Sequence, residues 1–243
     1  MFTEIDKKKK QIDEKRPLSK YTINNIRDEL LLQWTYNSNA IEGNTLTLRE
    51  TKVVLEDGFT IGGKTLTEHL EVVNHKEAIF YIEDIVNEEE PLSEKQIKNI
   101  HYLILKGIDD EKAGVYRERK VIISGASHTP PPPYQLKSKM EGLISWYRNV
   151  GSKLHTVERA AKLHTDFVNI HPFVDGNGRT ARLLLNFELM KEGYPPAIIR
   201  TEDRRDYYEA LDKAATTGDY DDFIRMVRDA VERSLDLYLD LIS

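Results

Sequence analysis

The segment from His171 to Arg182 brings together side chains that could perform phosphate chemistry. It reads His-Pro-Phe-Val-Asp-Gly-Asn-Gly-Arg-Thr-Ala-Arg, and so contains a histidine, a carboxylate, two glycines and two arginines. Near pH 7 the His171 imidazole can be neutral and can take a proton from an attacking hydroxyl. Asp175 supplies a hard carboxylate oxygen, which suits Mg²⁺ held jointly with phosphates. The segment therefore contains a candidate general base and a candidate metal ligand.

The backbone and the arginines of the same segment predict an anion site. Gly176 and Gly178 allow a tight turn that brings backbone N–H groups close to a ligand. A helix that begins at about Arg179 would direct its free N–H groups and its positive dipole end toward the same loop. Arg179 and Arg182 are three residues apart and lie on one side of that helix, where guanidinium forks match phosphate oxygens. Together these features predict phosphoryl or nucleotidyl transfer.

The segment also resembles the signature of the Fic family, HPFx[DE]GNGRxxR, and it matches every specified position. The resemblance extends over most of residues 92–215. It implies a protein adenylyltransferase, which moves AMP from ATP to a hydroxyl side chain of a target protein. It further implies that His171 deprotonates that hydroxyl and that Asp175 holds Mg²⁺ across the α- and β-phosphates.

The resemblance assigns the rest of the loop to the nucleotide. Asn177 and the amides of Gly176 and Gly178 would cradle the α-phosphate. Arg179 and Arg182 would hold the β- and γ-phosphates. The implied nucleotide-binding loop comprises Gly176, Asn177, Gly178, Arg179, Thr180, Ala181 and Arg182.

A second motif lies upstream, where residues 38–43 read Ser-Asn-Ala-Ile-Glu-Gly. This matches the family's inhibitory pattern, [ST]xxxE[GN]. Ser38 and Glu42 are four residues apart, so on a helix they share a face. Gly43 is well suited to end that helix just after Glu42. In related enzymes the glutamate pairs with the second arginine, here Arg182, and displaces the γ-phosphate. A carboxylate there satisfies the arginine and repels the last phosphate, so the resemblance implies the subclass with an N-terminal inhibitory helix.

One stretch predicts strands. Val115–Ile123, followed by Ser-Gly-Ala-Ser, is typical of a β-ribbon that turns at Gly125, and Pro130–Pro133 then require an extended path. In the family this flap covers the active site and holds the target segment by strand-like pairing. The flap residues expected to border the nucleotide are Gly125, Ala126, Ser127 and His128.

Tyr207 and Tyr208 match a tyrosine pair that lies near the adenine and ribose in relatives, although one of two adjacent tyrosines on a helix is usually core. A relative carries an asparagine eight residues beyond the first tyrosine and uses it on the nucleotide. Ala215 occupies that position here, so the resemblance leaves the base selectivity open. His164 is interpreted as structural, because no carboxylate pattern accompanies it that would indicate a metal cluster.

The elements that must position these residues are mainly helices. Apolar residues recur every three or four positions in residues 23–34, 70–82, 97–105, 160–170, 183–190 and 223–239. The predicted fold class is mainly α, a Fic-type helical bundle with one small β-hairpin. A boundary near Pro91 would divide an N-terminal helical region (1–90), which carries the inhibitory segment, from a catalytic core with C-terminal helices (91–243).

Composition narrows the function classes. The net charge of −6 gives no overall attraction to nucleic acid, and the lack of cysteine excludes disulfides, thiolate zinc sites and cysteine nucleophiles. We find no apolar run of 18 residues and no apolar core for a signal peptide near the lysine-rich start. These features predict a cytoplasmic protein that has no membrane partner.

The sequence thus predicts a Mg²⁺-dependent protein adenylyltransferase that is inhibited by Glu42. Its partners would be ATP and a hydroxyl of a target protein or of the chain itself, and a homodimer is left open. One alternative is removal of AMP from a modified protein, with Glu42 positioning a water. Another is a nucleotide-binding interaction module with vestigial catalysis. The intact His171 and Asp175 argue against the module, because a pure binder needs no base.

Overall fold

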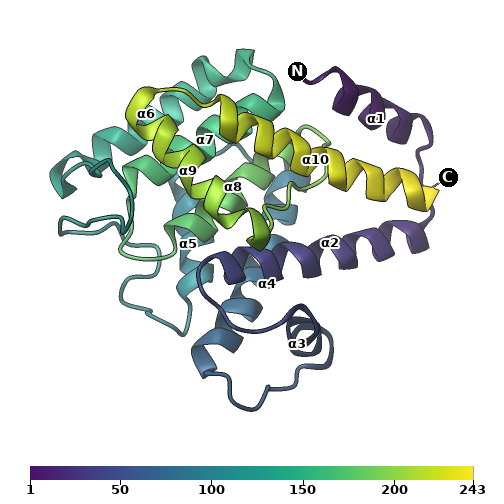
Figure 1. The fold of residues 1–243 in the computed structure, drawn as a ribbon, viewed down its shortest axis with the longest axis horizontal. Coiled ribbons are helices and arrows are strands. Elements are labelled where there is room, and N and C mark those ends of the chain that lie inside the picture. The colour runs from purple at the N-terminus through teal and green to yellow at the C-terminus, as the bar shows by residue number, and fades with distance from the viewer. Residues whose placement is uncertain (243) are drawn as a thin grey trace.

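The regular secondary structure of the described residues is helical. The computed structural model describes residues 1–242, and its α-helices are shown in Figure 1. They are α1 (Thr3–Glu14), α2 (Lys20–Ile41), α3 (Leu48–Lys52), α4 (Leu66–Asn87), α5 (Glu94–Leu105), α6 (Leu136–Asn149), α7 (Thr156–Ile170), α8 (Asn177–Lys191), α9 (Arg204–Thr217) and α10 (Asp221–Ile242). The prediction of a mainly helical fold is confirmed.

Helices α7 and α8 form an antiparallel pair at the centre of the molecule. Helix α8 is buried on most of its circumference, so other elements surround it. Leu184 packs into one hydrophobic cluster with α4, α5 and α6, whereas Leu185 packs into a second cluster with α1, α9 and α10. Residues 171–176 form the loop that joins α7 to α8. The candidate catalytic residues therefore lie between the two hydrophobic clusters.

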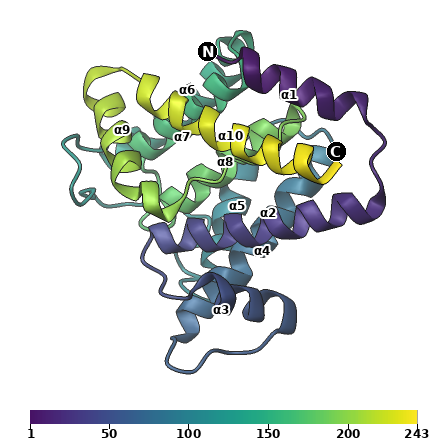
Figure 2. The same ribbon diagram turned by 45° about the vertical axis from the view of Figure 1, so that its right-hand side comes forward.

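The N-terminal helices are packed onto this centre. Figures 1 and 2 show α10 lying between α1 and α2, and α10 contacts both of them. Helix α2 begins at Ser19, whose side chain accepts a hydrogen bond from the Thr22 N–H. Helix α4 begins with a capping box between Thr65 and Glu68. At its other end, α2 brings Glu42 against the first turns of α8.

The expected β-hairpin is not present. Within residues 1–242 no strand is formed, and the loop between α5 and α6 follows an irregular path. The turn at Gly125 does exist, with φ of 81° and a hydrogen bond from the Ala126 N–H to the Ile123 carbonyl. The arms do not form a ladder, because the Arg117 N–H bonds to Pro172 and the returning Pro130–Pro133 have no N–H to donate.

Two further expectations relate to the chain as a whole. Among the described helices, none is both long enough and apolar enough to span a bilayer. The division into residues 1–90 and 91–243 stays a prediction.

Candidate active site

The loop after α7 is shaped by one unusual backbone position. His171 has φ of 49°, in the left-handed region that non-glycine residues seldom occupy, and its N–H still bonds to the Phe167 carbonyl. Pro172 prevents the helix from continuing. The Asn177 side chain then closes the loop, since it accepts a hydrogen bond from the Phe173 N–H and donates one to the Phe173 carbonyl, both at 3.0 Å. Gly176, with φ of 74°, leads directly into α8.

Two residues that sequence analysis missed hold this loop from outside. His101 of α5 accepts a hydrogen bond from the Gly114 N–H at Nδ1, so its Nε2 carries the proton that it donates to the Asp175 carbonyl at 2.8 Å. Arg117 donates through Nε to the His171 carbonyl at 2.8 Å and through Nη2 to the Pro131 carbonyl. The backbone of the loop is therefore braced by α5 on one side and by the segment before Gly125 on the other. Neither contact could be predicted from the spacing of residues near His101 or Arg117 in the sequence.

The upstream motif meets the second arginine of the loop. Arg182 Nη2 lies 2.7 Å from Glu42 Oε1, and both residues come from helix ends that face each other. Ser38 does not bond to Glu42; its hydroxyl and its carbonyl both accept hydrogen bonds from Arg182, at 3.0 and 2.8 Å. Arg182 also donates to the Tyr207 hydroxyl. The guanidinium is thus enclosed by oxygen atoms and is almost fully buried.

The Glu42 carboxylate occupies the anion position at the start of α8. A Cβ atom added to Gly178 would lie 2.3 Å from Glu42 Oε1, so the carboxylate rests directly on the first turn of the helix. The first N–H groups of a helix have no partners within it and attract negative charge. Glu42 is therefore positioned where a phosphate group would be expected to bind.

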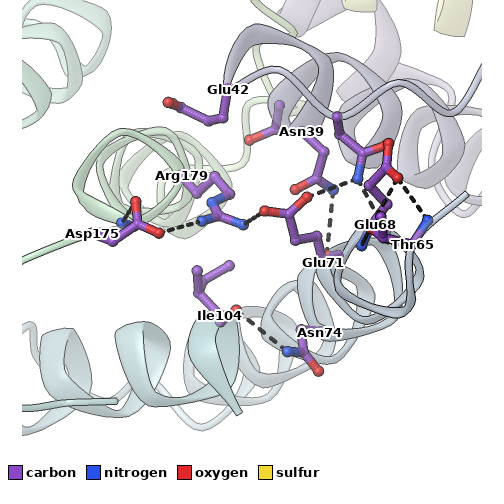
Figure 3. Close-up of polar contacts among 12 residues, drawn as sticks. Asn39, Glu42, Thr65, Glu68, Glu71, Asn74, Ile104, Asp175 and Arg179 are labelled. Atoms are coloured by element: carbon purple, nitrogen blue, oxygen red, sulfur yellow. Dashed lines mark hydrogen bonds and ion pairs between the residues drawn. The ribbon is translucent and has the colours of Figure 1, made fainter. Parts of the chain in front are cut away.

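The first arginine of the loop has a different partner. Figure 3 shows Arg179 between Asp175 and Glu71, a residue of α4. Arg179 Nη1 lies 2.8 Å from Glu71 Oε1, whereas its Nη2 lies 3.5 Å from Asp175 Oδ2. The side chain is 3% exposed. Its expected contact with phosphates stays a prediction.

A cavity of about 400 Å³ unites much of the predicted site. It is lined by Glu42, His171 and Gly178 from the two motifs, and by both Tyr207 and Tyr208. Across from them, the expected flap residues that line it are Gly125, Ala126 and His128. The Ser127 N–H instead bonds to Asp212 of α9, at 2.6 Å. The lining residues that sequence analysis did not single out include Val168, Asn169, Arg204, Leu211 and Asp212.

Several predicted residues have side chains that are buried or already hydrogen-bonded. Thr180 and Ala181 are fully buried inside the first turns of α8. The Asn177 side chain is committed to Phe173, so only its backbone amide is free for the expected role at the α-phosphate. Of the tyrosine pair, Tyr207 is core and bonds to His164, while Tyr208 is partly exposed.

Burial and charge shift the pKa values of His171 and Arg182 in opposite directions, which keeps His171 neutral and Arg182 charged. Burial lowers the pKa of His171 to about 4, Arg117 and His128 act in the same direction, and the Val168 carbonyl and Glu42 oppose them. Burial by itself would lower the pKa of Arg182, but Tyr207 and Glu42 more than offset it, so the pKa is raised. His171 is therefore unprotonated near pH 7, ready to accept a proton, while Arg182 remains a cation.

Asp175 fits a single-carboxylate magnesium site. Its side chain is 72% exposed, and Oδ1 accepts one hydrogen bond, from the Gly176 N–H at 2.6 Å. Among residues 1–242 there is no cluster of three or more His, Asp or Glu side chains that could hold a metal by themselves. Mg²⁺ typically takes one or two carboxylates and completes its shell with phosphates and water. An exposed carboxylate next to an anion position meets that requirement.

Comparison with known proteins gives consistent matches. The model of the Fic/DOC family matches residues 91–189. "Protein adenylyltransferase Fic" of Nematostella vectensis is 41% identical over 237 residues, covering 94% of this chain and 55% of that protein. The protein of the same name from Aedes aegypti is 39% identical over 244 residues, covering 97% of this chain and 48% of that protein. The chain thus spans about half the length of these curated relatives.

Solved structures share the fold over nearly the whole chain. A Fic domain containing signaling protein from Bacteroides thetaiotaomicron is 33% identical with a TM-score of 0.89, and the match covers 99% of this chain and 97% of that one. Fic-1 (residues 134–508) from C. elegans is 31% identical with a TM-score of 0.89, and the match covers 98% of this chain and 71% of that one. With the complete signature on the α7–α8 loop and these matches in fold and sequence, the chain belongs to the Fic/DOC family.

Proposed function

We propose that the chain is a protein adenylyltransferase that transfers AMP from ATP to a hydroxyl side chain of a protein. The observation that carries this proposal is the cavity in which His171 lies beside the start of α8 and the Glu42–Arg182 pair. A base, an anion position and a fixed cation are the elements that attack on a phosphate requires. The names of the relatives from Nematostella vectensis and Aedes aegypti support AMP as the transferred group.

In the proposed reaction the target hydroxyl attacks the α-phosphorus of ATP. His171 takes the hydroxyl proton as the new O–P bond forms, and the bond between the α-phosphorus and the bridging oxygen breaks, so that pyrophosphate leaves. The amides of residues 176–178 and Arg182 hold the phosphates, and Asp175 would hold Mg²⁺. When bound, Mg²⁺ neutralises negative charge on the phosphates.

Glu42 makes the resting state inhibited in this proposal. Its carboxylate satisfies Arg182 and lies against Gly178, which is where the terminal phosphates would otherwise bind. ATP therefore competes with a carboxylate that is already part of the protein, and like charges oppose its productive position. Removal of the carboxylate should open the site.

The loop between α5 and α6 is proposed to recognise the target. Ile122 is 90% exposed next to the turn, and the backbone of this stretch forms no ladder. Unpaired backbone groups beside the cavity can accept an extended target segment by strand addition. The β-hairpin expected from the sequence would then form with the target bound.

Labelling with ATP tests the proposal. The Glu42→Gly variant is incubated with a cell lysate and with ATP that carries the label either on the α-phosphate or on the γ-phosphate. We expect label on protein from the α-position and none from the γ-position, and we expect His171→Ala in the same background to abolish it. Labelling from the γ-position would indicate phosphoryl transfer instead. ATP binding without any protein labelling would favour an interaction module.

A second candidate function rests on the position of Glu42. Its side chain is 31% exposed and lines the same cavity as His171, so it can reach a water molecule beside a bound AMP group. The chain would then remove AMP from a modified protein. Release of labelled AMP from a premodified target by the wild type, and loss of that release in Glu42→Gly, would favour this function.

A further inference from the structure

Glu71 of α4 lies outside the cavity, yet it contacts the loop that carries the candidate chemistry. Its Oε1 atom lies 2.8 Å from Arg179 Nη1, across 108 residues of sequence. Its Oε2 atom accepts a hydrogen bond from the Asn44 side chain at 2.8 Å. Both carboxylate oxygens are therefore engaged, and Glu71 is not a cavity-lining residue. Neither sequence motif includes it.

The Arg179 guanidinium is shared unequally between two carboxylates. The contact with Glu71 has the length of a charge-assisted hydrogen bond, whereas the contact with Asp175, at 3.5 Å, is longer than a normal hydrogen bond. Arg179 is almost completely buried and Asp175 is largely exposed. Figure 3 shows the order of the three side chains, with Arg179 in the middle. The geometry leaves the Asp175 carboxylate only weakly neutralised.

We propose that Glu71 is a positioning residue that draws Arg179 away from Asp175 and thereby keeps the Asp175 carboxylate available to a divalent cation. A buried guanidinium that loses one carboxylate moves toward the other, because an unpaired buried charge is costly. Without the charge of Glu71, Arg179 would pair with Asp175 and compete with the cation. This inference rests on the proposed role of Asp175 in holding Mg²⁺ with ATP.

The same carboxylate is tied to the segment that carries Glu42. Asn44 lies two residues after Glu42, and its side chain donates both to Glu71 Oε2 and to the Glu68 carbonyl. Asn39, on the last turn of α2, donates to the Glu71 carbonyl at 3.4 Å. The inhibitory segment and Arg179 therefore hold Glu71 from opposite sides, which orients its carboxylate between them.

The test is the gain in ATP affinity that Mg²⁺ brings. All variants carry Glu42→Gly, so that the nucleotide position is open. The dissociation constant of ATP is measured by calorimetry in excess EDTA and in excess Mg²⁺, and the ratio of the two values is compared. Any direct contact of Arg179 with phosphate contributes to both values and cancels in the ratio. Loss of a residue that orients a metal ligand typically lowers metal affinity by about 10–100-fold.

We expect Glu71→Gln to lower this ratio by about tenfold or more. Adding Arg179→Gln should restore the ratio, because no guanidinium then remains to compete for Asp175. The matched control is Glu77→Gln, on the same helix, which removes an exposed ion pair with Lys106 and should leave the ratio unchanged. If Glu71→Gln does not fold, Glu71→Asp replaces it and should lower the ratio by a smaller factor.

The outcomes separate the inference from the proposal beneath it. An unchanged ratio in Glu71→Gln overturns the inference, and so does a lowered ratio that Arg179→Gln fails to restore, since that pattern indicates general damage. Asp175→Ala should bring the ratio close to one. If Asp175→Ala keeps the ratio of the parent, the proposed magnesium role of Asp175 fails, whatever the Glu71 variants do.

Discussion

Two arginine–glutamate pairs in this molecule have the same chemistry and different burial. Arg159 of α7 pairs with Glu188 of α8, whose side chain is 0% exposed and also accepts a hydrogen bond from the Tyr147 hydroxyl. Arg182 of α8 pairs with Glu42, which ends α2 and lines the cavity. The first pair joins the two central helices inside the core. The second joins a central helix to the tip of a peripheral one.

This difference determines what each pair can do. Burial raises the pKa of Glu188, although Tyr147 and Arg159 oppose the shift, and its side chain has no exposed surface. Glu42 lines the cavity, so in the proposed function another anion can take its place. The same ion pair is therefore a permanent link where both partners are sealed and an exchangeable one where one partner faces a cavity.

The largest expected effect is on stability at the sealed pair. Glu188→Gln puts a neutral amide beside the buried Arg159 cation, whose remaining carboxylate partner is the exposed Glu192 at 2.8 Å. Breaking a buried pair typically costs about 3–5 kcal/mol. Chemical unfolding should show this loss, and ATP-dependent labelling should not rise. The double variant Arg159→Met/Glu188→Leu removes both charges and should recover much of the stability. A Glu188→Gln protein of normal stability would contradict the comparison.

At the exchangeable pair, Glu42→Gly should raise labelling from ATP by roughly 10–100-fold, in the range of typical couplings between sites. Its free energy of unfolding should fall by less than that of Glu188→Gln, because water in the cavity can solvate Arg182. Arg182→Ala breaks the same pair but removes the phosphate ligand, so it should not activate. Self-labelling of Glu42→Gly and Arg182→Ala beside wild type measures this difference. Equal labelling of wild type and Glu42→Gly would remove the inhibitory role.

The opposite wall of the cavity gives a smaller effect. Ile122→Pro removes a backbone donor from the loop that is proposed to pair with the target, while the exposed side chain itself contributes little to the fold. Labelling of other proteins should drop several-fold, by roughly one lost hydrogen bond, with ATP affinity unchanged. The measurement is ATP affinity by calorimetry together with labelling in the Glu42→Gly background. A parallel fall in both would show that the loop serves the nucleotide.

The Ser38→Ala variant tests whether Ser38 of the upstream motif stabilises Arg182 or Glu42. Because its hydroxyl accepts from Arg182 and not from Glu42, Ser38→Ala should cost about 0.5–1.5 kcal/mol of stability. Its labelling should lie well below that of Glu42→Gly, since the carboxylate stays in place. Thermal unfolding and self-labelling report the two quantities. Activation equal to that of Glu42→Gly would mean that the serine, not the carboxylate, closes the site.

The smallest effect is the titration of His171. Its folded pKa of about 4 lies below the ordinary value of 6.5, so the neutral ring stabilises the fold fully above pH 6.5. That contribution is lost as the pH falls from 6.5 through 4. NMR of the imidazole, assigned by comparison with His171→Gln, should show no protonation between pH 6 and 8. A midpoint near 6.5 would mean that the ring is solvated rather than buried.

Much of the site was readable from the sequence, because its parts are close along the chain. His171 and Asp175 lie in the loop of residues 171–176 and Gly178 on the first turn of α8, and helical periodicity predicted the two flanking helices. The position of Glu42 at a helix end followed from four-residue spacing and a glycine. Local geometry of this kind depends on backbone sterics and helix period, which each segment carries by itself.

The contacts that the tertiary structure decided link residues far apart in sequence. Local spacing indicated neither the bond from Ser38 to Arg182 in place of Glu42, nor the pairing of Glu71 with Arg179, nor the support that His101 and Arg117 give the loop. The missing hairpin has the same origin, since Arg117 and the prolines find partners outside a ladder or have no donor. The sequence determined which groups the site contains and the helices that carry them. Only packing of α4 against α8 decided that Glu71 neutralises Arg179, because ion pairs and hydrogen bonds act over a few ångströms between segments that the fold alone brings together.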